Sequence, residues 1–147
     1  MKNRAFTLVE IMVVVGIVAL LAALAINIMV RSRMNANETV AIGSTRTVNS
    51  ACQSYYSVVI PHEYPDSLAI LGVSGVTGPS YIDTSLASGT KSGYIYTYQK
   101  TSVVTFVLYV DPQVPGRTGE RFFYTDETGR TTANKGGRAG PSDPSIS

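Results

Sequence analysis

Hydrophobic residues are concentrated in one stretch near the start of the chain. Residues 6–30 are almost wholly apolar, and only Thr7, Glu10, Gly16 and Asn27 interrupt them. As a helix, the 20 residues from Ile11 to Val30 extend about 30 Å, which matches the hydrocarbon core of a bilayer. The pattern therefore predicts a helix in residues 6–30 that is able to span a membrane.

After residue 30 the pattern becomes that of a helix with one buried face. No proline occurs before Pro61, and six residues recur at spacings of 7, 7, 4, 3 and 4: Met34, Ala41, Val48, Cys52, Tyr55 and Val59. Such spacings place side chains on one helix face, so we predict one helix from about Phe6 to about Val58, amphipathic over residues 31–60. Its exposed faces are expected to carry Asn35, Asn37, Glu38, Thr39, Arg46, Thr47 and Asn49.

Alternating and β-branched residues in the second half of the chain predict a sheet. Residues 94–98, 103–110 and 121–125 have strand patterns, and a weaker strand at 130–133 follows a turn at 126–129. We expect three or four antiparallel strands that pack one face on the amphipathic stripe of the helix. The predicted fold class is therefore α+β, with a long N-terminal helix and a small antiparallel sheet.

The remaining segments lack these patterns and are expected to connect or follow the regular elements. Residues 61–65 contain two prolines that end the helix, residues 66–72 resemble a short capped turn, and residues 73–93 have a loop composition. Tyr81, Ile82 and Leu86 are expected to pin this loop to the core. We therefore predict a head of loop and sheet at 61–133, and a flexible Gly-, Pro- and Ser-rich tail at 134–147.

Composition and charge exclude several classes of protein. A chain of 147 residues with a formal net charge of +2 is too short for a large multidomain enzyme and has no basic field for a phosphate backbone. Nucleic acid is therefore an unexpected partner. One cysteine and one histidine, Cys52 and His62, exclude an internal disulfide and a structural Cys/His zinc site.

Candidate catalytic and metal-binding residues have simpler structural interpretations. Cys52 falls on the apolar stripe of the helix, where a small core residue is expected rather than a nucleophile activated by His62. Asp66, Asp83, Asp111 and Asp126 do not form a run of oxygen ligands at spacing two, so turns are expected rather than a calcium site. We predict no catalytic residue, no metal and no cofactor.

Glu10 is the residue of the apolar stretch that most needs an explanation. An ionised carboxylate at the start of such a span costs about 3 kcal/mol or more unless it reaches water or a cation. In the first case Glu10 lies among lipid headgroups at the start of a plain signal anchor. In the second case a positive charge satisfies it.

The residues around Glu10 resemble the start of type IV prepilins. A short leader with Lys2 and Arg4 precedes Ala5-Phe6-Thr7-Leu8-Val9-Glu10, and the apolar helix follows without a gap. The resemblance implies that a prepilin peptidase removes residues 1–5 by cutting between Ala5 and Phe6, then methylates the new Phe6 amine. It also implies that the Phe6 ammonium pairs with Glu10 of a neighbouring subunit during assembly.

Two positions depart from the usual pattern of this family. Ala5 stands before the cut where the family usually has glycine. Asn27 stands where many members have a helix-breaking proline, so a weaker local disruption of the helix is expected in a filament.

The resemblance implies a structural subunit of a pilus-like filament rather than an enzyme. Its expected partners are the prepilin peptidase, identical or related pilin subunits, an inner-membrane assembly platform and, before assembly, membrane lipid. The expected location is the bacterial inner membrane, in a single pass with a cytoplasmic N-terminus, and then a surface or periplasmic filament. Lys2 and Arg4 favour that orientation, while Arg31 and Arg33 weaken the charge bias.

Two alternatives remain open at this stage. A pseudopilin of a type II secretion system has the same N-terminal pattern and differs in what its filament does. A membrane-anchored or secreted small binding domain is the alternative from another class, because Ala23-Leu24-Ala25 imitates a signal cleavage site whose use would release a chain beginning at Ile26.

Overall fold

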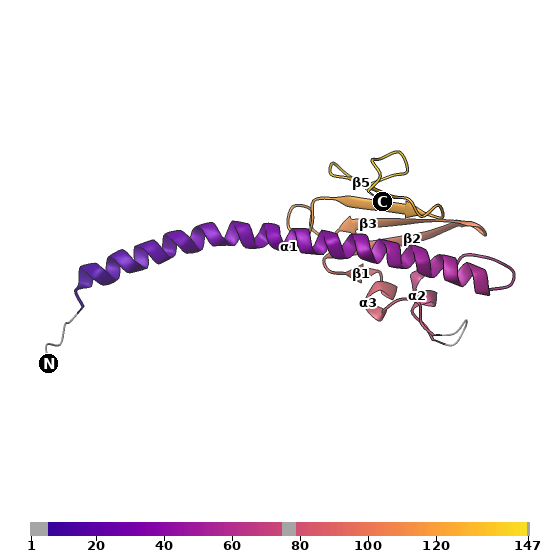
Figure 1. Ribbon diagram of the computed structural model, residues 1–147, viewed down its shortest axis with the longest axis horizontal. Coiled ribbons are helices and arrows are strands. Elements are labelled where there is room, and N and C mark those ends of the chain that lie inside the picture. The colour runs from indigo at the N-terminus through magenta and orange to yellow at the C-terminus, as the bar shows by residue number, and fades with distance from the viewer. Residues whose placement is uncertain (1–5, 75–78, 147) are drawn as a thin grey trace. The chain divides into compact units, whose positions relative to one another are not determined.

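The computed structural model describes residues 6–74 and 79–146, and its contacts divide the chain into two units, residues 1–33 and 34–147. Helix α1, Leu8–Val58, contributes its first part to one unit and its second part to the other (Figure 1). The predicted helix from about Phe6 to about Val58 is thus confirmed. Proline is absent from α1, and Pro61 follows shortly after its end.

The second unit contains a five-stranded antiparallel sheet whose strands follow one another in sequence order. The strands are β1 (Thr90–Lys91), β2 (Tyr94–Ser102), β3 (Thr105–Pro112), β4 (Phe122–Asp126) and β5 (Thr131–Asn134). In the register of the sheet, Tyr96 lies opposite Val110, and Val110 lies opposite Phe123. The α+β plan is confirmed, but the expected count of three or four strands is wrong.

The additional strand, β1, lies in the segment that we expected to be a loop. Its two residues are polar and provide no hydrophobic alternation, because the strand is formed by pairing with β2. Ser92 and Gly93 join the two strands with positive φ angles of 48° and 75°, the geometry that a two-residue hairpin turn requires. Pairing and turn geometry therefore create a strand that hydrophobic patterning does not indicate.

Two short helices connect α1 to the sheet. Helix α2, Leu68–Leu71, occupies the predicted capped turn, and helix α3, Thr84–Ala87, lies in the predicted loop. The Asp83 carboxylate caps α3 by accepting a hydrogen bond from the Leu86 N–H at 2.9 Å. Ile82 and Leu86 are buried, which confirms that they pin this segment to the core, while residues 75–78 lie outside the described part.

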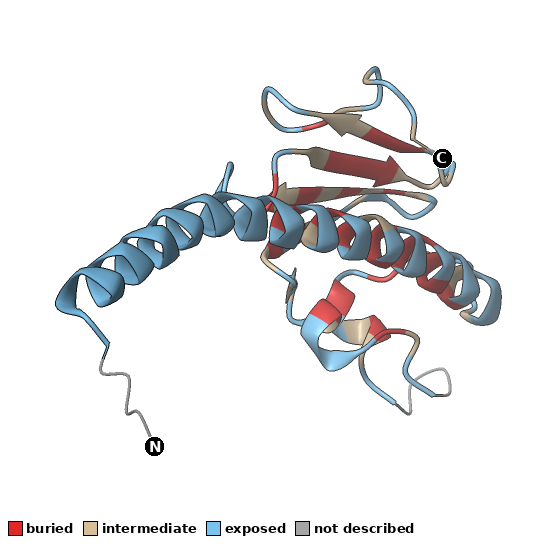
Figure 2. Ribbon diagram, turned by 60° about the vertical axis from the view of Figure 1, so that its left-hand side comes forward, coloured by how far each residue is buried: buried red, intermediate tan, exposed pale blue. Residues whose placement is uncertain are grey.

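The core of the second unit lies between the stripe of α1 and the sheet. Figure 2 shows the buried stripe on this part of the helix and the buried residues of the facing strands. Met34, Ala41, Val48, Cys52 and Tyr55 are buried and Val59 is partly buried, as the spacing predicted. Alternate residues of β3 complete the core from the sheet side: Phe106, Leu108 and Val110.

Two polar residues of α1 that we expected on exposed faces are instead buried. The Glu38 carboxylate accepts hydrogen bonds from the backbone N–H of Glu120, at 2.8 Å, and from Nε of Arg121, at 2.7 Å. Nδ2 of Asn49 donates to the carbonyl oxygen of Asp126 at 2.7 Å. Our expectation was wrong for Glu38 and Asn49. Partners some 80 residues away in sequence satisfy the hydrogen bonding of these two side chains, so the side chains can be buried.

The C-terminal segment, predicted as a flexible tail at 134–147, makes backbone contacts with the edge strand β5. The N–H of Ala133 donates to the carbonyl oxygen of Pro144 at 3.0 Å, and the N–H of Ile146 donates to that of Thr131 at 2.9 Å. These bonds cover part of the β5 edge, which would otherwise present unpaired backbone groups. The flexibility of the segment in solution stays a prediction.

Candidate assembly segment

The first part of α1 is an apolar helix surface with no buried residue. Every described residue from Phe6 to Arg33 is exposed, including large aliphatic side chains such as Leu20 and Leu24, which are 65% and 61% exposed. Within the described residues, α1 is the helix that is long and apolar enough to cross a membrane. So large an apolar surface requires lipid or protein around it.

A reciprocal pair of hydrogen bonds defines the start of this helix. Thr7 immediately precedes α1 and donates to Oε2 of Glu10 from both its backbone N–H, at 2.9 Å, and its hydroxyl, at 2.8 Å. The backbone N–H of Glu10 donates in return to Oγ1 of Thr7 at 3.3 Å. This arrangement is a capping box, which satisfies backbone donors that a helix start leaves without partners.

The capping box gives Glu10 a structural role that the sequence analysis did not include. Glu10 lies in the first turn of α1, where a negative charge also interacts favourably with the positive end of the helix dipole. The signal was present in the sequence, because Thr7-Leu8-Val9-Glu10 has the spacing of a capping box before an apolar run. Thr7 is therefore the residue of this segment that sequence reasoning missed.

Of the predicted site residues Ala5, Phe6 and Glu10, the structure describes the last two. Ala5 lies outside the described residues, whereas Phe6 is 81% exposed and Glu10 is also exposed. In the uncut chain the nitrogen of Phe6 belongs to a peptide bond, so it carries no positive charge. A Phe6 ammonium exists only after the bond between Ala5 and Phe6 is cut, so the predicted pairing with Glu10 requires that cut.

Cys52 and His62, the two residues considered for catalysis, occupy different environments. Cys52 is fully buried, and this burial raises the pKa of its thiol to about 12, so the thiol stays protonated near neutral pH. His62 is exposed, and its Nδ1 lies 2.9 Å from the carbonyl oxygen of Tyr56. Neither environment activates a nucleophile.

The four aspartates considered for calcium binding have other roles in the structure. Asp66, for example, pairs with the Lys100 ammonium, which Glu63 also contacts. Asp83 caps α3, and Asp126 accepts a hydrogen bond at 3.0 Å from the N–H of Thr128 in the turn after β4. No group of three or more metal-binding side chains is found among residues 6–74 and 79–146. The interpretation of Asp126 as a turn residue is confirmed, whereas Asp83 caps a short helix that was not predicted.

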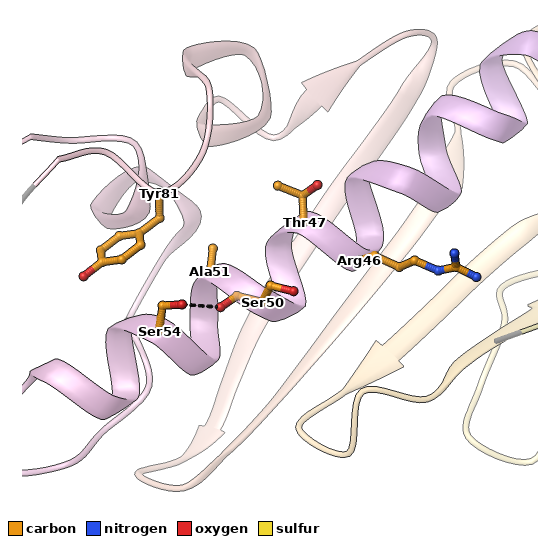
Figure 3. Close-up of a pocket in the computed structure, with 6 residues that line it drawn as sticks. All are labelled: Arg46, Thr47, Ser50, Ala51, Ser54 and Tyr81. Carbon is orange, nitrogen blue, oxygen red and sulfur yellow. Dashed lines mark hydrogen bonds between the residues drawn. The ribbon is translucent and has the colours of Figure 1, made fainter.

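A shallow groove lies beside the second part of α1, with a cavity volume of about 380 Å³. Its lining residues are Arg46, Thr47, Ser50, Ala51, Ser54 and Tyr81 (Figure 3). The hydroxyls of Thr47 and Ser54 donate to helix carbonyls of Gly43 and Ser50, at 3.0 and 2.9 Å. These hydroxyls are engaged with the backbone of α1, and no carboxylate or histidine among the described residues lines the groove to activate them for chemistry.

Comparison with known proteins identifies the N-terminal segment. The family described as the prokaryotic N-terminal methylation motif matches residues 1–26. Comparison with curated proteins and comparison with solved structures give no match. The match covers residues 1–5, the capping box and most of the apolar span, and it leaves the head to be interpreted from its own structure.

Proposed function

We propose that the chain is a structural subunit of a type IV pilus-like filament, whose N-terminal segment is both its membrane anchor and its assembly element. The observation that carries the proposal is the methylation motif at residues 1–26 together with the apolar N-terminal helix, which fit a type IV pilin or prepilin-like protein. Proteins of this type are usually structural rather than enzymatic, which agrees with the buried, protonated Cys52.

Before assembly, the apolar part of α1 is held in the bacterial inner membrane as a single span with its N-terminus in the cytoplasm. The exposed aliphatic surface of residues 11–30 has the length of the hydrocarbon core. During assembly the same surface exchanges lipid for the helices of neighbouring subunits. Lipid covers the apolar surface before assembly, and neighbouring subunits cover it in the filament. Because this exchange involves only residues of the span, it needs no unfolding of the head.

Processing creates the charge that assembly uses. Prepilin peptidase cuts between Ala5 and Phe6, and methylation of the new amine leaves it able to carry a positive charge. Loss of Lys2 and Arg4 leaves ten basic and ten acidic side chains. Subunits therefore meet without strong net repulsion.

Glu10 then serves two partners through its two carboxylate oxygens. Among the described residues, the hydrogen bonds of the carboxylate all go to Oε2, which leaves Oε1 for the Phe6 ammonium of a neighbouring subunit. Attraction between opposite charges is strong where water is excluded, so this pairing stabilises the subunit in the filament core. Before this pairing forms, the hydrogen bonds from Thr7 hold the Glu10 carboxylate at the helix start.

A matched set of variants separates pairing from capping. Glu10→Gln removes the charge but keeps a residue that a capping box accepts, Glu10→Ala removes both, and Thr7→Val removes the capping hydroxyl alone. Membrane fractionation and the recovery of subunits in sheared filaments are measured for each variant. We expect all three to insert, Thr7→Val to assemble, and both Glu10 variants to be lost from filaments.

One outcome would contradict the pairing. If Glu10→Gln enters filaments as efficiently as the unaltered subunit while Glu10→Ala does not, the capping box and not the charge is what assembly requires.

A pseudopilin of a type II secretion system is the second candidate function, because the same methylation motif fits it. Deletion of the gene distinguishes the two candidates. Loss of sheared surface filaments with normal protein export supports the pilus subunit, whereas loss of export with surface filaments intact supports the pseudopilin.

A further inference from the structure

Two arginines that follow the apolar span have no counterion in the described structure. Arg31 and Arg33 are exposed and come directly after Val30. The ion pairs found among the described residues involve Lys91, Lys100, Arg121, Lys135 and Arg138. Arg31 and Arg33 therefore have no ion-pair partner among the described residues, and both are available to bind a partner outside the chain.

The nearest carboxylates along α1 cannot serve these arginines. Glu10 lies 21 residues before Arg31, which is roughly 30 Å along a helix. Glu38 is 7% exposed and is engaged by the Glu120 N–H and by Arg121. The carboxylates of α1 therefore leave Arg31 and Arg33 without a counterion, and an anion from outside the chain can neutralise them.

The spacing of the two residues indicates what kind of partner fits. Successive helix residues are 100° apart, so Arg31 and Arg33 point about 160° apart around the helix axis. A protein that docks on one side of α1 would reach one of them. A layer of lipid headgroups surrounds a spanning helix, and it reaches both.

We propose that Arg31 and Arg33 bind the phosphate groups of anionic phospholipids in the outer leaflet of the membrane that holds the subunit before assembly. The inference rests on the membrane storage in the proposed function. When residues 11–30 fill the hydrocarbon core, the two side chains lie at the level of the phosphates. The planar guanidinium group donates two parallel hydrogen bonds to a phosphate, a geometry that an ammonium group does not have.

The two ends of the span differ in the basic residues that they keep after processing. Cleavage removes Lys2 and Arg4 from the cytoplasmic end, whereas Arg31 and Arg33 remain at the other end. After processing, Arg31 and Arg33 thus provide most of the electrostatic attraction between the span and the lipid. Entry into a filament must break this attraction, so the arginine pair opposes premature departure from the bilayer.

The test uses the full-length protein in phospholipid vesicles. The chain has no tryptophan and nine tyrosines, so Val30→Trp introduces a single tryptophan beside the arginines, whose fluorescence can be excited selectively. Its quenching by brominated phosphatidylglycerol is compared with its quenching by brominated phosphatidylcholine. The comparison is made for the reporter protein, for the double variant Arg31→Gln/Arg33→Gln, and for Arg46→Gln as control.

Arg46 is a matched control because it is also exposed and forms no ion pair within the described residues, yet it lies well beyond the span. We expect the reporter protein to prefer phosphatidylglycerol, with roughly a fivefold contribution from each arginine. The preference should be lost in the double variant, kept in Arg46→Gln and weakened by salt.

The contrary results separate the inference from the proposed function. An unchanged preference in the double variant, or an equal loss in Arg46→Gln, overturns the arginine–phosphate inference while the helix remains in the bilayer. Absence of quenching by either lipid in every protein means that the helix is not inserted, and it overturns membrane storage as well. Normal lipid binding by the double variant combined with its failure to assemble would assign the arginines to a protein contact.

Discussion

The two parts of α1 differ in where their packing partners come from. Residues 8–33 have no buried side chain, whereas ten residues between Met34 and Tyr55 are buried. Both parts are regular helix, so backbone hydrogen bonding does not distinguish them. The difference is that the second part has a sheet from its own chain to pack on, whereas the first part has no packing partner among the described residues.

We infer from this contrast that the two parts of the helix have separate roles. The second part stabilises the head through aliphatic, aromatic and polar contacts, and it includes the buried Glu38 and Asn49. The first part retains its apolar surface for interactions outside the chain. Substitutions in the two parts should therefore affect different measurable properties, folding in one case and assembly in the other.

The largest expected difference comes from the same substitution made in the two regions. Leu108 is fully buried in the core, whereas Leu24 is 61% exposed on the apolar span. Leu108→Ala should lower the free energy of unfolding of the head by about 2–5 kcal/mol, and Leu24→Ala should change it by less than about 0.5 kcal/mol. Denaturant unfolding in detergent, followed by near-ultraviolet circular dichroism of the tyrosines, measures both; similar losses would contradict the division.

A smaller effect is expected from the buried carboxylate that joins α1 to the segment before β4. Glu38→Gln removes the charge that interacts with Arg121 and weakens the acceptor for the backbone N–H groups of Glu120 and Arg121. We expect a loss of about 1–3 kcal/mol in the free energy of unfolding. Glu127→Gln, at a residue with no ion pair among the described residues, should change it little. Equal effects would show that the contact is not specific.

The same carboxylate predicts a pH dependence of head stability. Burial acts to raise the pKa of Glu38, but hydrogen bonds from the Glu120 N–H and Arg121 outweigh it and lower the pKa below its ordinary 4.5. Glu38 therefore contributes stability above that ordinary value, and the contribution is lost as the pH falls through the lowered pKa. Unfolding measured from about pH 6 to about pH 3 should show a weaker acid loss in Glu38→Gln; an identical acid profile would contradict this role.

The smallest perturbation is a chemical probe of the head that leaves its sequence unchanged. Burial raises the pKa of the Cys52 thiol from 9.0 to about 12, so at a given pH the thiolate fraction is on the order of a thousandfold lower than in an unfolded chain. Iodoacetamide should label Cys52 only when the head unfolds. Labelling of the folded head at the rate of a small thiol would show that the core beside α1 is open.

Hydrophobic spacing predicted the parts of the fold that depend on regular patterns. The full length of α1, its buried stripe and strands β2 and β3 follow from such patterns because burial of alternate or helically spaced residues forms them. Strands β4 and β5 bury adjacent residues, and their β-branched and aromatic composition and the turn between them predicted them. β1 did not follow, since it is created by its pairing and by the Ser92-Gly93 turn. The burial of Glu38 and Asn49 did not follow either, because their partners are distant in sequence.

The candidate site was only partly predictable for a different reason. The residue pattern at 5–10 was sufficient to propose cleavage, methylation and pairing, because these depend on a local motif. The proposed pairing of Phe6 with Glu10 requires a second subunit and an amine that exists only after the cut, so one uncut chain cannot display it. The capping role of Thr7 was available from the spacing and became clear from the hydrogen bonds.

The most direct test of the central claim is the identity of the first residue of the mature chain. Mass spectrometry of the protein recovered from membranes and from sheared filaments determines both the N-terminal residue and its modification. We predict a chain that begins at methylated Phe6 in both fractions. A chain that begins at Met1 or at Ile26 would contradict the account, because it would indicate a plain signal anchor or an exported domain.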